Sequence, residues 1–156
     1  MMTIRQACPE DATALLGLIA EALDEDRIRH GPGNPVPSLA ELQISLGFRQ
    51  SQFQGGFELV AVIDTQIIGF VFYSWVWRTY APAIYIDDLF VKSDYRNRGF
   101  GKQLLHAALQ RAKSAGARQA YLFVDVQNVD AQRLYKTEGA KSIEEAETNL
   151  AYMWSL

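Results

Sequence analysis

Two adjacent carboxylates and a cationic glycine-rich loop are the parts of this 156-residue chain best suited to chemistry. Asp87 and Asp88 lie within an apolar, β-branched run, Ala83 to Val91, which predicts a strand covered on both faces. Because side chains alternate along a strand, the two carboxylates point to opposite faces. At least one must face a cleft or a partner, since a buried unpaired charge is costly. A carboxylate in such a place can serve as a general base.

The loop after this strand has the composition of an anion site. Gly99 and Gly101 stand where a helix is about to begin, and Arg96, Arg98 and Lys102 surround them. Glycines let the backbone turn tightly, and a helix N-terminus adds about half a positive charge. The segment therefore predicts a phosphate-binding turn. From these residues alone, a simple helix-start turn with surface arginines fits equally well.

The elements that must position these residues follow from hydrophobic periodicity and turn signals. We expect helices from Pro9, from Leu39 after a Ser38 and Glu41 capping box, and from Phe100 to a stop at Gly116. A last helix, Val129 to Glu138, is capped by Asn128 and closed by Gly139. The expected strands are Thr3 to Gln6, Phe57 to Ile63, Gln66 to Trp77, Ala83 to Val91, Ala120 to Val126 and Leu150 to Leu156. This order predicts a mixed α/β sheet with crossover helices.

Two connections can also be predicted. Asp64 and Thr65 join two strand runs and indicate a tight hairpin. The segment Asp26 to Pro37 contains two glycines and three prolines and predicts a loop. The acidic residues before it, including Glu25, are interpreted as a solvated helix face or as part of a groove for a cation.

Composition restricts the classes of function. With 49% hydrophobic and 21% charged residues and a net charge of −3, the chain predicts one soluble domain, residues 1–156, with no nucleic-acid partner. A membrane-spanning helix needs about 18 consecutive apolar residues, and no apolar run in the sequence is that long. No signal peptide is visible. Cys8 is the only cysteine, which favours a cytoplasmic setting and a small buried hydrophobe rather than a nucleophile. No His/Cys cluster predicts a metal site.

The loop sequence has a more specific form. Arg96 to Gly101 reads Arg-x-x-Gly-x-Gly after an acidic strand, and it resembles the acetyl-CoA-binding motif of the GNAT superfamily of N-acetyltransferases. Asn128, Leu134-Tyr135-Lys136 and Gly139-Ala140 resemble the last helix of that superfamily. Within it the chain is most similar to the spermidine/spermine and thialysine N-acetyltransferases. Those enzymes carry glutamate in place of Asp87, and a Glu-Gly-Trp stretch where this chain has Glu147-Thr148-Asn149.

The resemblance implies a mostly antiparallel sheet splayed between two parallel strands and flanked by helices. Acetyl-CoA, the co-substrate, would lie in the split between the Ala83 to Val91 and Ala120 to Val126 strands. Its pantetheine would pair with backbone at the end of the first strand, and its pyrophosphate would rest on the loop amides. The implied coenzyme-binding residues are Leu89, Phe90, Val91, Arg96, Asn97, Arg98, Gly99, Phe100, Gly101, Lys102, Asn128 and Tyr135.

The same resemblance assigns the catalytic roles. A protonated primary amine has a pKa of about 10.4, so deprotonating it at pH 7 costs roughly 4 to 5 kcal/mol. Asp87, matching the family's glutamate, would act as base through a water, and Asp88 would be a structural group. Tyr135 would donate a hydrogen bond to the departing thiolate, or else serve only in packing. Attack would be direct, because no activated Cys or Ser is visible.

The acceptor is open at this point. A small primary amine, such as a polyamine or diamine, is the first hypothesis, and an amino acid, a protein N-terminus or a lysine is the alternative. A non-catalytic acyl-CoA-binding sensor is a hypothesis of another class. A homodimer is implied by the family resemblance alone.

Overall fold

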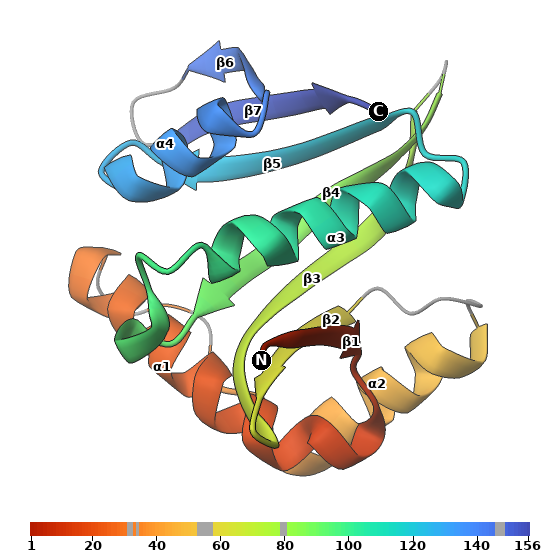
Figure 1. Cartoon of the computed structure of the whole chain (residues 1–156), viewed down its shortest axis with the longest axis vertical. Helices are drawn as coiled ribbons and strands as arrows, with labels where there is room; N and C mark the ends of the chain where they lie inside the picture. Colours follow the sequence, from red (N-terminus) through yellow and green to blue (C-terminus); the bar gives the residue numbers. More distant parts are fainter. Residues whose placement is uncertain (31–32, 34, 53–57, 79–80, 146–148) are drawn as a thin grey trace. The chain divides into compact units, whose positions relative to one another are not determined.

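The computed structural model of the chain describes residues 1–30, 33, 35–52, 58–78, 81–145 and 149–156 (Figure 1). The side chains of His30 and Trp77, and residues 147–148, lie outside this description. The helices are α1 Ala12–His30, α2 Leu39–Gln52, α3 Phe100–Ser114 and α4 Val129–Thr137, with short 3-10 turns at Pro9–Asp11 and Ser93–Tyr95. The strands are β1 Thr3–Gln6, β2 Glu58–Ile63, β3 Gln66–Arg78, β4 Ala81–Val91, β5 Gln119–Asp125, β6 Lys141–Glu145 and β7 Asn149–Ser155.

The strands form one mixed sheet in the order β1-β2-β3-β4-β5-β7-β6. The pairs β1 with β2, β5 with β7, and β6 with β7 are antiparallel, whereas β4 and β5 are parallel. A parallel pair needs a crossover connection, and α3 supplies it between β4 and β5. The predicted fold class, a mostly antiparallel sheet containing one parallel pair and flanked by helices, is confirmed.

Two predictions about elements were wrong. The loop predicted to begin at Asp26 begins later, because α1 continues to His30. Asp24 to Arg29 contains no helix breaker, and Arg27 Nη1 approaches Asp24 Oδ1 at 3.5 Å across one turn. The strand β6 was missed, since Lys141-Ser142-Ile143-Glu144-Glu145 has a single apolar residue and its register shifts between Ser142 and Glu144. Its position is set by pairing with β7 rather than by its own pattern.

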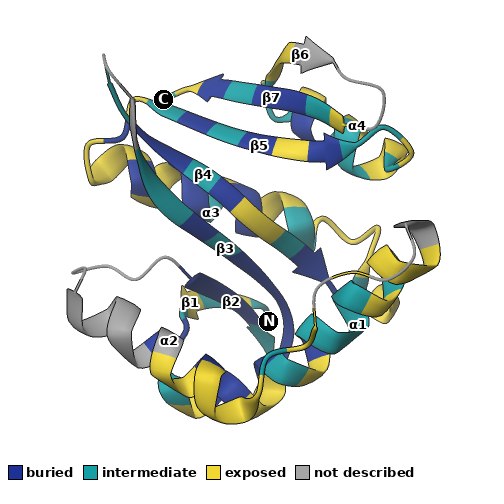
Figure 2. Ribbon diagram, turned by 180° about the vertical axis from the view of Figure 1, so that it is seen from behind, coloured by how far each residue is buried: buried dark blue, intermediate teal, exposed yellow. Residues whose placement is uncertain are grey.

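The described residues form two compact units. The first contains residues 1–71 and 89–104, and the second contains residues 72–88 and 105–156. The elements β3, β4 and α3 each contribute residues to both units. Figure 2 shows that buried residues run along the strands, whereas exposed ones predominate on the described part of α2, and α1 carries mainly intermediate and exposed residues. The prediction of a single domain stays a prediction.

Each unit buries its own apolar side chains. Fully or almost fully buried residues of the first unit are Leu15, Leu46, Leu59, Ile68, Phe70 and Leu104. Those of the second unit are Ile84, Leu105, Ala108, Leu122, Tyr152 and Trp154. Among the described residues, no helix is long and apolar enough to cross a membrane.

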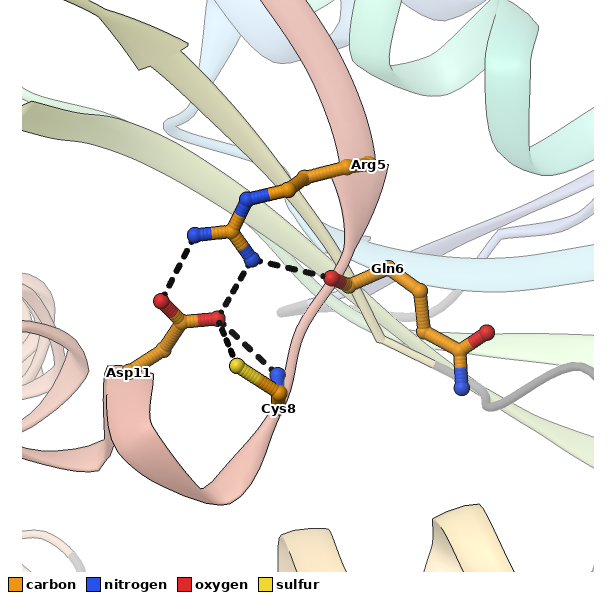
Figure 3. Close-up of polar contacts among 4 residues, drawn as sticks. All are labelled: Arg5, Gln6, Cys8 and Asp11. Carbon is orange, nitrogen blue, oxygen red and sulfur yellow. Dashed lines mark hydrogen bonds and ion pairs between the residues drawn. The ribbon is translucent and has the colours of Figure 1, made fainter. Parts of the chain in front are cut away.

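The start of α1 is fixed by a bidentate ion pair that the sequence did not predict (Figure 3). Arg5 Nη1 and Nη2 donate to Asp11 Oδ2 and Oδ1 at 2.6 and 2.7 Å. Asp11 Oδ2 also accepts hydrogen bonds from the Cys8 backbone N–H at 2.9 Å and from the Cys8 thiol at 3.3 Å. The Arg5 hydrogen bonds lower the pKa of Asp11, while burial raises the pKa of the Cys8 thiol. Cys8 is half-buried rather than buried, so the expectation of a core hydrophobe was wrong, and its raised pKa disfavours a thiolate.

The β2–β3 connection and the β3–β4 approach both depend on backbone detail. Asp64 and Thr65 have φ values of 47° and 72°, which confirms the tight hairpin. Gly69 on β3 lies close to the end of β4. A Cβ on Gly69 would lie 2.6 Å from the Phe90 carbonyl oxygen and 3.2 Å from Leu104 Cδ1 and from Val91 Cγ2. Only glycine permits this approach.

Candidate active site

The two carboxylates lie on β4 with exposed side chains, directly after buried Ile86. Ser74 on β3 donates its hydroxyl hydrogen to Asp87 Oδ2 at 2.7 Å. This contact orients the carboxylate of Asp87. Ser74 is a residue that sequence reasoning missed, because its cross-strand register with Asp87 is visible only in the sheet.

The parallel ladder between β4 and β5 is short. Its register joins Ala83 to Gln119, Ile84 to Ala120 and Tyr85 to Tyr121, while β5 continues to Asp125. Over that continuation β5 pairs with β7, as far as Asp125 opposite Asn149. Within the second unit, Asp87 and Asp88 therefore lie beyond the last parallel pair with β5. The expected split between these two strands begins at Tyr85.

Tyr135 is held by the short helix α4. Asn128 Oδ1 accepts a hydrogen bond from the Ala131 N–H at 3.2 Å, which confirms Asn128 as the N-cap. The Tyr135 ring packs against Tyr152 and Trp154, with centroid distances of 6.0 and 5.8 Å. Trp154 Nε1 donates to the Glu138 carbonyl at 3.0 Å and so ties β7 to the end of this helix. The packing role foreseen for Tyr135 is therefore present.

The acidity of Tyr135 is suppressed. Burial, and to a smaller extent the charge of Asp88, raise the pKa of Tyr135 to about 12. Complete proton transfer from this phenol to a thiolate whose thiol has a pKa of about 8.5 is unfavourable by roughly 5 kcal/mol. A phenol with this raised pKa suits a neutral hydrogen-bond donor better than a general acid. The charge of Asp88 therefore also acts on Tyr135.

The glycine-rich loop belongs to the first unit and leads directly into α3. Asn97 and Gly99 have φ values of 58° and 79°, so left-handed residues stand on both sides of Arg98. Residues 96–99 are exposed, and α3 begins at Phe100. The first amides of a helix have no partner within the helix, and successive amides in such a turn form a concave anion site. The local geometry therefore agrees with the predicted phosphate-binding turn.

The two arginines of the loop have different surroundings. Arg96 Nε donates to the Val91 carbonyl and its Nη2 to Glu25 Oε1, both at 2.7 Å, and its Cζ lies 5.1 Å from the Phe90 ring centroid. Arg98 Cζ lies 5.6 Å from the ring centroid of Tyr95 and 5.1 Å from that of Phe100. Arg96 is thus held by polar contacts, whereas Arg98 lies against the neighbouring rings of Tyr95 and Phe100.

The predicted site residues are distributed over the two units. The carboxylates Asp87 and Asp88, together with Asn128 and Tyr135, belong to the second unit. The first unit holds Leu89 to Val91 and the loop Arg96 to Lys102. Among the described residues, no group of three His, Cys, Asp or Glu side chains could hold a metal ion.

A mixed sheet with a parallel pair and a glycine-rich turn at a helix start are the features from which the sequence predicted a coenzyme A-dependent acyltransferase. The model of the acetyltransferase (GNAT) family matches residues 19–140, most of the chain. The chain belongs to this family, and the predicted acyltransferase activity class is confirmed.

Relatives and solved structures agree with this assignment. The thialysine N-epsilon-acetyltransferase of Bos taurus is 33% identical over 153 residues, covering 92% of this chain and 86% of the bovine protein. The enzyme of the same name from Sus scrofa is 34% identical over 82 residues, covering 52% of this chain and 48% of the pig protein. The crystal structure of the PaiA N-acetyltransferase of Thermoplasma acidophilum in complex with coenzyme A superposes with a TM-score of 0.79 at 19% identity, covering 100% of this chain and 99% of that one. This last likeness supports the fold.

Proposed function

We propose that this protein transfers the acetyl group of acetyl-CoA to a primary amine of a small, diamine-like molecule by direct attack. The observation that carries the proposal is the Arg-x-x-Gly-x-Gly turn in a chain of the GNAT family, with left-handed backbone at Asn97 and Gly99 immediately before α3. The turn presents amides to a diphosphate, and the family defines the acyl chemistry.

Acetyl-CoA is the co-substrate in this proposal. Its diphosphate rests on the amides of residues 97–102, and its pantetheine pairs with the backbone of Leu89 to Val91 as an added strand would. A backbone N–H near Leu89 or Phe90 is then placed to stabilise the oxyanion of the tetrahedral intermediate. Asn128 fixes the start of α4, the helix that carries Tyr135.

The proposed chemistry assigns one task to each polar group. Asp87, oriented by Ser74, accepts the proton of the amine through a water, because its side chain is one methylene shorter than glutamate. The amine nitrogen loses a second proton when the amide forms, and that proton neutralises the leaving thiolate while Tyr135 donates a hydrogen bond to the sulfur. No covalent enzyme intermediate is formed.

The acceptor class rests on the relatives. The pig and bovine relatives are thialysine N-epsilon-acetyltransferases, and a thialysine side chain ends in a primary amine. A cytoplasmic location, a single domain over residues 1–156 and a homodimer are parts of the same proposal. The first two are supported by the single cysteine and the chain length, and the third by the family resemblance.

Release of free thiol from acetyl-CoA tests the proposal directly. The panel contains thialysine, ornithine, spermidine, lysine and a peptide with a free N-terminus. We expect turnover with the small diamines at least tenfold above that with the peptide, a difference of about 1.4 kcal/mol in transition-state binding. Tyr135→Phe is the matched control and should lower kcat much more than KM for acetyl-CoA.

Other outcomes decide between the alternatives. Turnover with thialysine, ornithine and lysine but not with spermidine would replace the diamine by an amino-acid acceptor, and turnover confined to the peptide would replace it by a protein acceptor. Binding of acetyl-CoA without thiol release on any amine would replace the enzyme by an acyl-CoA sensor.

A further inference from the structure

We propose that Arg96 is a positioning residue of the coenzyme loop and not a ligand of the coenzyme's phosphates. Its side chain ties the loop to the end of β4 and to helix α1. The inference rests on the proposed function, because it concerns how the same loop is held ready for the diphosphate.

The contacts of the Arg96 guanidinium use its polar edges and one face. Nε donates to the carbonyl of Val91, the last residue of β4, at 2.7 Å. Nη2 donates to Glu25 Oε1 on α1, also at 2.7 Å, across 71 positions of sequence. The guanidinium plane lies over Phe90 with its Cζ 5.1 Å from the ring centroid. Charge-assisted bonds of this length are strong, and stacking on an aromatic ring fixes the orientation of the group.

The backbone of Arg96 is held as firmly as its side chain. The Arg96 N–H donates to the Ser93 carbonyl at 3.1 Å, which closes the 3-10 turn Ser93–Tyr95. Main chain and side chain together fix the residue directly before Asn97, where the left-handed turn begins. Because the amides that follow must converge on one anion, fixing their starting point sets the geometry of the site.

Arg98 provides the contrast within the same loop. Its guanidinium lies against the aromatic rings of Tyr95 and Phe100, with Cζ 5.6 and 5.1 Å from the ring centroids. Rings against its face leave the N–H groups at its rim available to oxygen acceptors. Arg98 is therefore the loop arginine that fits a phosphate contact, and it serves as the matched control for Arg96.

Glu25 gives a test in which the two roles predict opposite signs. If Arg96 bound phosphate, Glu25 would compete with the coenzyme, and Glu25→Gln would tighten acetyl-CoA binding. If Arg96 positions the loop, Glu25→Gln weakens binding, because one anchor is lost. Glu21→Gln, one turn earlier on α1, makes the same change in charge and controls for the general electrostatic effect.

The experiment measures the Kd of acetyl-CoA by titration calorimetry for the full chain and its variants. We expect Glu25→Gln to raise Kd severalfold, Arg96→Ala to raise it about tenfold, and the Glu25 effect to disappear in the Arg96→Ala background. Arg96→Lys keeps the charge but not the forked geometry, so it should resemble Arg96→Ala. Arg98→Ala should raise Kd in a way that high salt diminishes.

The outcomes separate the two proposals. Tighter binding by Glu25→Gln, or full recovery of affinity in Arg96→Lys, would overturn the positioning role. A wild-type chain that gives no heat with acetyl-CoA would instead overturn the proposed function. Far-ultraviolet circular dichroism identifies a variant that fails to fold, and Glu25→Gln, a change at a partly exposed side chain, then carries the test.

Discussion

Tyr135 combines a buried ring with a neighbouring negative charge, and both keep its hydroxyl protonated. Its pKa is raised to about 12, mainly by burial and to a smaller extent by the charge of Asp88. A phenol whose pKa is raised on folding contributes stability at all pH values below its unfolded value of about 10. That contribution is lost as the pH rises from about 10 to about 12. At neutral pH the residue is therefore a hydrogen-bond donor in nearly every molecule.

Asp88→Asn tests the electrostatic part of this account. Removing the charge should lower the pKa of Tyr135, but the pKa should stay above the ordinary value of about 10, because burial remains. The change is measured by following tyrosinate absorbance against pH. The absorbance step that is absent in the Tyr135→Phe variant is assigned to Tyr135.

Asp87→Asn is the matched control for that titration. Asp87 contributes to the raised pKa of Tyr85 but is not a cause of the shift at Tyr135. The Asp87→Asn substitution should therefore lower the pKa of Tyr85 and leave the pH of the Tyr135 absorbance step unchanged. An equal displacement of Tyr135 by both variants would show that the link to Asp88 is not specific.

At the residue scale, sequence alone predicted local backbone conformation better than it predicted side-chain contacts. The turn around Gly99 and the cap at Asn128 follow from local backbone preferences, so the motif was sufficient to place them. The bond from Ser74 to Asp87 and the bond from Arg96 to Glu25 join residues 13 and 71 positions apart. Such contacts are set by sheet register and helix docking, which no local pattern encodes.

Among the secondary-structure elements, β4 depends on the absence of a side chain on its neighbour β3. A methyl group at Gly69 would meet the Phe90 carbonyl oxygen at 2.6 Å, a distance that real Cβ atoms essentially never show. A backbone carbonyl cannot rotate away as a side chain can, so the end of β4 must move. That end includes Phe90 and Val91, whose backbone is proposed to pair with the coenzyme.

Gly69→Ala should therefore lower the free energy of unfolding by about 1 to 3 kcal/mol and weaken acetyl-CoA binding as well. Urea unfolding and calorimetry measure the two effects. Gly17→Ala on α1 is the matched control, since no atom lies within 4 Å of its added Cβ. There alanine should stabilise the chain by about 0.5 to 1 kcal/mol through helix propensity. Similar losses in both variants would contradict the close-approach argument.

The elements themselves were largely predictable, with instructive exceptions. Strongly periodic or apolar segments such as α3 and β3 can be predicted from their hydrophobic spacing. The last turns of α1 did not, because the acidic and basic residues from Asp24 onward resemble a loop in composition while retaining helix propensity. The strand β6 was not predicted, because its own residues do not favour a strand and its conformation is set by pairing with β7.

On the scale of the whole molecule, the two compact units share three continuous elements. The strands β3 and β4 and the helix α3 each pass from one unit to the other without a break in secondary structure. If one unit unfolded alone, α3 would lose hydrogen-bonded turns, and buried residues such as Leu104 or Leu105 would become exposed.

We therefore expect a single cooperative unfolding transition, with equal calorimetric and van't Hoff enthalpies. Differential scanning calorimetry on the full chain measures both quantities, and far-ultraviolet circular dichroism should give the same midpoint. Two resolved transitions would show that the units unfold independently and would contradict the single domain predicted for residues 1–156.

The hairpin between β2 and β3 affects how much thermal tolerance the enzyme can gain by engineering. Thr65 is β-branched, yet its φ is 72°, in a region that Asn or Gly occupies at much lower cost. The present turn thus stores strain of about 1 to 2 kcal/mol. Relieving it with Asn-Gly would be a substantial gain for a protein of this size, whose total stability is only about 5 to 15 kcal/mol.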